Sequence, residues 1–121
     1  MSKRILVVED HEDNRQILRD LLGSAGYEMI EAGNGEAGVA AAAAEHPDLI
    51  LMDIQLPILD GYEATRQIKS DPALSAIPII VVTSYALSGD EEKARIAGCD
   101  AYVAKPYSPR QLLARIRDFL D

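Results

Sequence analysis

The chain predicts a doubly wound α/β fold, a three-layer (βα)5 sandwich around a five-stranded parallel sheet with strand order 2-1-3-4-5. Short β-branched apolar runs alternate with helical patterns from end to end, and residues that begin or end helices stand between them. The 121 residues are 48% apolar and 26% charged, the balance of a soluble globular protein. We expect one domain over residues 1–121, with no output domain and right-handed crossovers.

Five segments have the composition of strands. The runs Ile5–Val8, Leu49–Met52 and Ile79–Val82 are almost continuously apolar, which is typical of parallel strands covered on both faces. Tyr27–Glu31 alternates between polar and apolar residues, as an edge strand does, and Ala101–Ala104 is a short fifth candidate.

The first two helices have recognisable ends. Asp13, with Gln16 three residues later, is expected to cap the first helix, which Gly26 would end. The apolar face of this helix is expected to hold Ile17, Leu18, Leu21, Leu22 and Ala25. The second helix is expected from Glu36 to Glu45, where an alanine run precedes Pro47.

The other three helices begin at capping patterns. Asp60 with Glu63, and Ser88 with Glu91, predict two starts, and Gly98 would end the second of these helices. The last helix begins at the segment 108–111, which combines a serine cap, a proline at the first helical position and a glutamine. Its apolar stripe is Leu112, Leu113, Ile116 and Leu120.

The charge of the chain argues against nucleic acid as a partner. Twenty acids against twelve bases leave a net charge of −8, and the bases are scattered. The sequence also shows neither a signal peptide nor an apolar run of membrane-spanning length. We therefore expect a cytoplasmic protein that binds neither nucleic acid nor membrane.

Polar residues follow four of the expected strands. Glu9 and Asp10 follow the first, Asp53 the third, Thr83 the fourth and Lys105 the fifth. In an open parallel sheet, functional residues gather beyond the carboxyl ends of the strands, where the strand order reverses. The order 2-1-3-4-5 would thus bring three carboxylates together, opposite a hydroxyl group and an ammonium group.

This constellation has the chemistry of phosphoryl transfer. Three close carboxylates need a cation such as Mg²⁺, and a carboxylate can attack phosphorus as a nucleophile. Lys105 would supply positive charge to the phosphoryl oxygens and Thr83 a hydroxyl donor. A cis bond between Lys105 and Pro106 would aim the lysine at the strand ends. We interpret His11, beside the acids, as a solvated loop residue.

These motifs resemble the receiver domains of response regulators in bacterial two-component systems. The resemblance covers Lys3 to Leu120 and rests on Val8-Glu9-Asp10, Leu51–Pro57 with Asp60-Gly61, Val82-Thr83-Ser84 and Tyr102–Pro106. It implies the sheet order of flavodoxin-like and CheY-like folds. Gly89–Glu92 and Cys99–Tyr102 are most similar to DivK-type single-domain regulators.

The resemblance implies a role for each residue of the site. Asp53 would be the phosphoacceptor, and Thr83 and Lys105 would bind the phosphoryl group. Mg²⁺ would be held by Glu9, Asp10, Asp53 and the main-chain carbonyl of Gln55. Tyr102 would change orientation together with Thr83 as a switch, with simple core packing as the alternative.

The implied function is phosphorelay signalling. A histidine kinase or a histidine phosphotransfer protein would phosphorylate Asp53 in the presence of Mg²⁺, and the conformational change would alter contacts with a downstream protein target. The protein would catalyse only its own phosphorylation and dephosphorylation, as a monomer or a phosphorylation-dependent dimer. A receiver excised from a hybrid histidine kinase and a degenerate receiver that acts only as a binding module are the alternatives.

Two other classes fit the sequence less well. A phosphatase of the haloacid dehalogenase type requires a second acid two residues after the nucleophile, where this chain has Gln55, and a cap domain. A flavodoxin-like carrier requires a phosphate loop rich in glycine and hydroxyl groups after the first strand. No such loop follows Val8 in this sequence.

Overall fold

The computed structural model describes residues 2–83 and 90–121, without the side chains of residues 83, 90 and 91. The strands are β1 (Arg4–Val8), β2 (Glu28–Ala32), β3 (Leu49–Asp53), β4 (Ile79–Thr83) and β5 (Ala101–Ala104). The helices are α1 (Glu12–Ser24), α2 (Gly35–Glu45), α3 (Gly61–Ser70), α4 (Asp90–Ala97) and α5 (Pro109–Leu120). No helix within the described ranges is long and apolar enough to cross a membrane.

The five strands form one parallel sheet in the order β2-β1-β3-β4-β5. This confirms the predicted fold class and strand order. The order reverses between β1 and β3, whose register places Val8 opposite Met52. The residues that follow these two strands therefore meet at the switch point, where sheets of this kind bind ligands.

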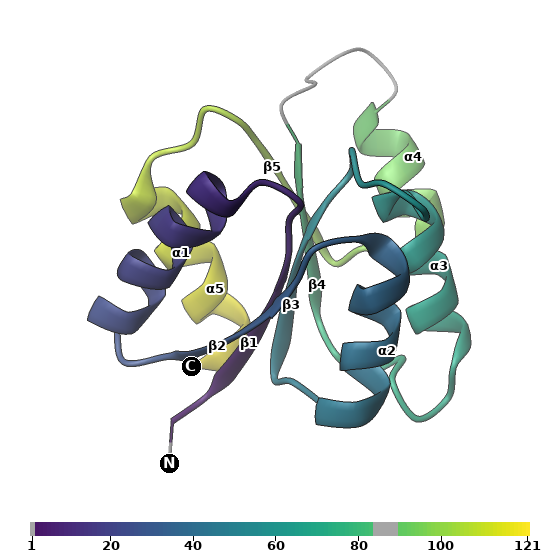
Figure 1. Ribbon diagram of the computed structural model, residues 1–121, viewed down its shortest axis with the longest axis horizontal. Helices are drawn as coiled ribbons and strands as arrows, with labels where there is room; N and C mark the ends of the chain where they lie inside the picture. Colours follow the sequence, from purple (N-terminus) through teal and green to yellow (C-terminus); the bar gives the residue numbers. More distant parts are fainter. Residues whose placement is uncertain (1, 84–89) are drawn as a thin grey trace.

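Helices cover both faces of the sheet, as Figure 1 shows, with α1 and α5 on one side and α2, α3 and α4 on the other. The pattern along β1 explains the two layers, because successive side chains of a strand point to opposite faces. Ile5 and Val7 pack in the core beneath α1 and α5, whereas Leu6 and Val8 pack beneath the other three helices. Burying each such side chain contributes about 1.5–3 kcal/mol, so packing on both faces stabilises the centre of the sheet.

Two predicted helix starts are confirmed in detail. The side chain of Asp60 accepts a hydrogen bond from the N–H of Glu63 at 2.9 Å. Ser108 accepts one from the N–H of Gln111 at 3.1 Å, and Pro109 is the first helical residue. Caps of this kind each contribute about 1 kcal/mol.

The predicted start of α1 is wrong. The helix begins at Glu12 with His11 at the N-cap, so Asp13 lies inside the first turn and caps nothing. The reason is the short loop after β1, where the buried Glu9 carboxylate accepts the N–H of His11 at 3.1 Å and starts the helix early. Ile17 is also 60% exposed and does not belong to the apolar face predicted for this helix.

Smaller differences concern single residues. α2 starts one residue before the predicted Glu36, because Asn34 caps it by accepting the N–H of Ala37 at 2.7 Å. β2 is shifted by one residue from the predicted range. Gly98, with φ +107°, ends α4 as predicted, whereas the Ser88 cap falls outside the described residues.

Gly61 allows the loop after β3 to close tightly on the end of that strand. Its N–H donates to the carbonyl oxygen of Ile54 at 2.9 Å. A Cβ atom at this position would lie 2.0 Å from the backbone oxygen of Asp53, closer than any real contact. Glycine therefore lets the loop hold the Asp53 main chain in place.

We expect Gly61→Ala to lower the free energy of unfolding by at least about 2 kcal/mol. The added methyl group would collide with the backbone of Asp53, and displacing that backbone costs free energy. Gly23→Ala is the matched control. It lies in α1 with nothing within 4 Å of the added methyl, so it should raise stability by about 0.5–1 kcal/mol. Urea unfolding measures both, and equal effects would contradict the close approach at Gly61.

Candidate phosphoacceptor site

Three of the predicted site residues converge at the carboxyl ends of the strands. The Lys105 ammonium lies 3.3 Å from Glu9 Oε2 and 3.8 Å from Asp53 Oδ2. Both carboxylate residues are almost completely buried, with 3% of Glu9 and 8% of Asp53 exposed. The peptide bond between Lys105 and Pro106 is cis. One cation therefore faces two buried carboxylates, with Asp10 beside them.

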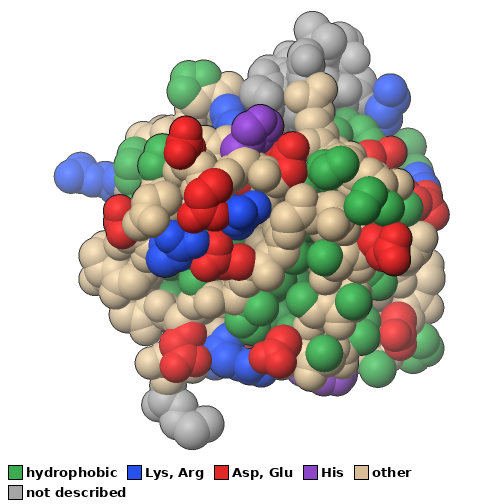
Figure 2. Space-filling view, in the orientation of Figure 1, with side chains coloured by type: hydrophobic (Ala, Val, Ile, Leu, Met, Phe, Trp, Pro, Cys, Tyr) green, Lys and Arg blue, Asp and Glu red, His purple; other side chains and the backbone are tan. Residues whose placement is uncertain are grey.

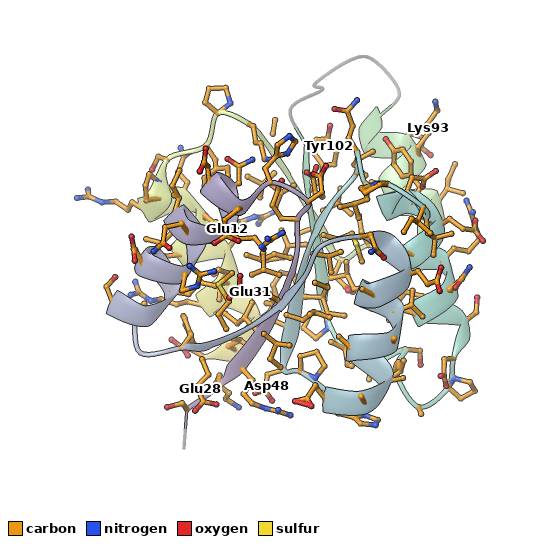
Figure 3. The ribbon with its side chains drawn as sticks, viewed as in Figure 1. Glu12, Glu28, Glu31, Asp48, Lys93 and Tyr102 are labelled. Atoms are coloured by element: carbon orange, nitrogen blue, oxygen red, sulfur yellow. The ribbon has the colours of Figure 1, made fainter. Side chains whose placement is uncertain are left out.

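The remaining predicted residues occupy different positions around this centre. Gln55 lies on the exposed loop after β3. Thr83 ends β4, where its backbone pairs with that of Ala104, and its side chain falls outside the described part of the chain. Tyr102 is half-buried on β5 and packs against the core cluster that includes Ala94 of α4 (Figure 3).

The Glu9 side chain is held by donors from the start of α1. Its Oε1 accepts the N–H of His11 at 3.1 Å and the amide of Asn14 at 3.3 Å. Its main-chain carbonyl accepts the guanidinium of Arg15 at 2.7 Å. Sequence reasoning missed Asn14 and Arg15, because only the turn geometry after β1 shows that they point back toward Glu9.

Arg15 belongs to an ion-pair network between α1 and β2. Glu12 and Glu31 each contact both Arg15 and Arg19, at distances from 2.5 to 3.4 Å. Figure 2 shows acidic and basic side chains interleaved over these two elements, and Figure 3 labels the two acids. The contact of Glu12 with Arg15 could be predicted from their spacing of three residues in α1. The contacts of Glu31 could not, because only the folding of the sheet brings β2 next to α1.

Asp10 has an oxygen that no donor satisfies. Its Oδ1 is buried and has no hydrogen-bond partner among the residues that the structure describes. The Nδ1 atom of His11 lies 3.1 Å away but is not in hydrogen-bonding geometry. A buried carboxylate oxygen without a donor is costly, and a bound cation would satisfy it.

The electrostatics of the two buried acids are coupled. Burial, the hydrogen bond with Glu9 and the negative charge of Glu9 together raise the pKa of Asp53 to about 7, because they outweigh the opposite effect of the Lys105 charge. Burial acts on Glu9 in the same direction. Hydrogen bonds from Asp53 and the His11 N–H, with the charge of Lys105, outweigh it and lower the pKa of Glu9. Without a cation, Asp53 therefore retains its proton up to about pH 7, whereas an aspartate in water loses it at about pH 4.

An apolar cavity opens beside this pair, between α1 and the loop from β5 to α5. Its volume is about 520 Å³, and its lining includes Glu9, Asp53, Lys105, Ile17 and Tyr107. Burial raises the pKa of the Tyr107 hydroxyl, and the charge of Glu9 adds to the effect. The two buried acids thus border a cavity that Ile17 and Tyr107 also line.

The sequence pattern of the response regulator receiver domain matches residues 5–117. The chain therefore belongs to the response regulator receiver domain family of two-component signalling, which confirms the resemblance found in its motifs. It is similar to the polar-differentiation response regulator DivK of Brucella ovis, with 45% identity over 120 residues that cover 99% of this chain and 98% of that protein.

Solved structures of receiver domains are similar over the same length. The receiver domain of a sensor histidine kinase from Pseudomonas aeruginosa PAO1, solved with a magnesium ion coordinated in its active-site cleft, is 37% identical. The TM-score is 0.92, and 99% of this chain and 98% of that one are covered. A CheY-like receiver domain protein from Methanospirillum hungatei JF-1 is 34% identical with a TM-score of 0.93, covering 100% and 95%.

The raised pKa of Asp53 has a consequence for stability. Between about pH 4 and pH 7 the folded, cation-free protein keeps a proton that the unfolded chain loses, so the free energy of unfolding falls as the pH rises. We expect Asp53→Asn to be more stable than the wild type by roughly 1–3 kcal/mol at pH 8 in EDTA, and the difference to shrink at pH 5.

Asp20→Asn is the matched control, because Asp20 is exposed on α1 and its contact with Gln16 can be kept by the amide oxygen. Urea unfolding at the two pH values measures the difference. A gain at Asp53 that does not depend on pH would show that the buried pair does not hold this proton.

Proposed function

We propose that this receiver domain accepts a phosphoryl group on Asp53. The observation that carries the proposal is the buried Asp53 carboxylate with the Lys105 ammonium 3.8 Å away at the switch point of the sheet. The family and the similarity to DivK support it. The substrate is the phosphorylated histidine of a histidine kinase or a histidine phosphotransfer protein.

The acidic residues fit a bound Mg²⁺. Within the described part of the chain, Asp10 has a buried oxygen that accepts no hydrogen bond, and the carboxyl groups of Asp53 and Glu9 lie close to each other. Mg²⁺ prefers a few carboxylates together with water and phosphate oxygens. We propose that Asp10 and Asp53 hold the ion, with Glu9 and the main-chain carbonyl of Gln55. When bound, the ion neutralises negative charge on the carboxylates and the phosphoryl oxygens.

Asp53, Lys105 and Thr83 have separate roles in the proposed transfer. A carboxylate oxygen of Asp53 attacks phosphorus, an O–P bond forms as the N–P bond breaks, and the leaving imidazole takes up a proton. Lys105 moves its ammonium from the carboxylates to a phosphoryl oxygen. Thr83 donates its hydroxyl to another oxygen.

The response follows from the same two groups. When Thr83 moves toward the phosphoryl group, Tyr102 turns inward and the surface of α4, β5 and the start of α5 changes. Tyr102 already packs against the core beside α4, so a modest difference in free energy between the two states is enough. A downstream protein reads this surface, or a second copy binds it as a phosphorylation-dependent dimer.

We further propose that residues 1–121 act as one receiver domain in the cytoplasm. Signalling then passes through protein contacts rather than through DNA or membrane binding, in agreement with the net charge of −8. The only chemistry that the domain catalyses is its own phosphorylation and dephosphorylation.

We expect wild-type protein mixed with acetyl phosphate and Mg²⁺ to gain the mass of one phosphoryl group, and Asp53→Asn to gain none. Intact-protein mass spectrometry measures the change. Asp20→Asn serves as the control with the same loss of charge at an exposed position, and it should gain the full mass. Full gain in Asp53→Asn, or no gain in the wild type, would contradict the assignment.

We expect Lys105→Ala to bind Mg²⁺ no more weakly than the wild type, because the ammonium competes with the ion for Glu9 and Asp53. The same variant should lose the change in the surface of α4, β5 and the start of α5 that we propose for the phosphorylated protein. Amide chemical shifts with beryllofluoride, a stand-in for the phosphoryl group, measure it over residues 90–107. Lys3→Ala, at an exposed position, should respond fully. Wild-type shifts in Lys105→Ala would remove the lysine from this role.

A further inference from the structure

His11 lies closer to the acidic residues than a solvated loop histidine requires. Its side chain is 70% exposed, in agreement with the sequence interpretation, but its Nδ1 atom turns inward. That atom is 3.1 Å from Asp10 Oδ1 and 3.3 Å from Glu9 Oε1. Ligand atoms of the three residues all lie within 4.8 Å of one another.

These separations are those of neighbouring ligands on one metal ion. Two donor atoms at about 2.1 Å from a cation, placed at a right angle, are about 3.0 Å apart. Both distances from His11 Nδ1 are close to this value. The ring nitrogen and the carboxylate oxygens can thus contact one ion with small movements of the side chains.

An ion pair between a protonated ring and the acids is the alternative. It accounts poorly for Asp10, whose Oδ1 is near the ring nitrogen and yet has no hydrogen bond from any described residue. The ring contacts Glu9 Oε1, an oxygen that also accepts the His11 main-chain N–H and the amide of Asn14. The His11 ring therefore contacts an oxygen that already has two donors, and it gives no hydrogen bond to the adjacent Asp10 Oδ1.

The backbone fixes His11 at this place. It is the N-cap residue of α1 with an extended conformation, φ −93° and ψ 121°, and its N–H bonds to Glu9 Oε1. The side chain itself makes no capping hydrogen bond to the helix. Capping therefore does not account for the histidine, since serine, threonine, aspartate and asparagine are the residues that helices prefer at this position.

We propose that His11 supplies an imidazole nitrogen to the divalent cation site, so that the site binds Mn²⁺ and Co²⁺ in preference to Mg²⁺. Mg²⁺ takes oxygen ligands, whereas imidazole suits first-row transition metals, which also bind carboxylates more tightly. The inference rests on the divalent cation site of the proposed function and adds a ligand and a selectivity to it.

The experiment compares wild type with His11→Asn and His46→Asn. Asparagine is a good N-cap residue, so the first variant keeps the start of α1 and replaces only the imidazole. His46 is the other histidine of the chain, exposed at the end of α2 in the left-handed conformation, which asparagine tolerates. It controls for the loss of a histidine elsewhere.

Isothermal titration calorimetry gives the dissociation constants of Mg²⁺ and Co²⁺ for each protein. We expect His11→Asn to weaken Co²⁺ binding about tenfold or more while Mg²⁺ binding changes little, and His46→Asn to resemble the wild type. Pulsed electron paramagnetic resonance of the Mn²⁺-loaded protein gives a direct signature. A ¹⁴N coupling of a bound nitrogen should appear in wild type and His46→Asn and be absent from His11→Asn.

Two negative outcomes are distinguishable. If the wild type binds Mg²⁺ but shows no ¹⁴N coupling, and His11→Asn leaves the ratio of the two dissociation constants unchanged, His11 is no ligand and the proposed function stands. If the wild type binds none of these cations, both this inference and the divalent cation site of the proposed function are overturned.

Discussion

The crowding of carboxylates at one end of the sheet is the interaction on which the site depends. Glu9 and Asp53 are buried beside each other, and Lys105, which lies 3.3 Å from Glu9 and 3.8 Å from Asp53, brings one positive charge to the two carboxyl groups. Burial and mutual repulsion raise the pKa of Asp53 to about 7. The site is therefore short of positive charge without a ligand, which is the condition that favours binding of a divalent cation.

Such a site needs a rigid base, and the parallel sheet supplies it. The side chains of β1 and β3 beneath the acids are almost completely buried on both faces, so the strands cannot relax apart to separate the charges. Gly61 closes the loop onto the backbone of Asp53, and Arg15 holds the carbonyl of Glu9. Packing energy distributed over the core thus maintains an electrostatic arrangement that is unfavourable by itself.

What the sequence predicts well is what depends on element order and local pattern. Strand ends follow from the apolar runs, so the convergence of Glu9, Asp53 and Lys105 could be predicted before any coordinate was known. Caps such as Ser108 follow from neighbours three residues apart. Membership of the response regulator receiver domain family follows from spaced motifs at those same strand ends.

What the sequence predicts poorly is the geometry of short loops. The early start of α1 makes His11 rather than Asp13 the N-cap residue and turns the imidazole toward the acids. Ile58, after Pro57, has φ +71° and is 74% exposed, and the N–H of Leu59 donates back to Pro57 at 2.7 Å. Neither a β-branched residue in that conformation nor a three-residue turn has a sequence signal, because both depend on how the loop after β3 closes in the folded protein.

At the opposite end of the sheet, the charged side chains are paired by hydrogen bonds. Lys69 of α3 donates to the carbonyl oxygens of Ser75 and Ile77 and to Asp100 Oδ2, at 2.8 to 3.1 Å. The same Asp100 oxygen accepts the N–H of Ile79 at the start of β4. These bonds satisfy the charges and join α3, β4 and the turn after α4.

The C-terminal end of α4 is therefore held, since Gly98 packs on the Lys69 side chain and the Cys99 N–H returns to Ala94. In the response that we propose, α4 would therefore move most at its N-terminal end, which is the end nearer the carboxyl edge of the sheet. The phosphorylation of Asp53 that we propose would then act on the part of the α4 and β5 surface that these bonds do not hold.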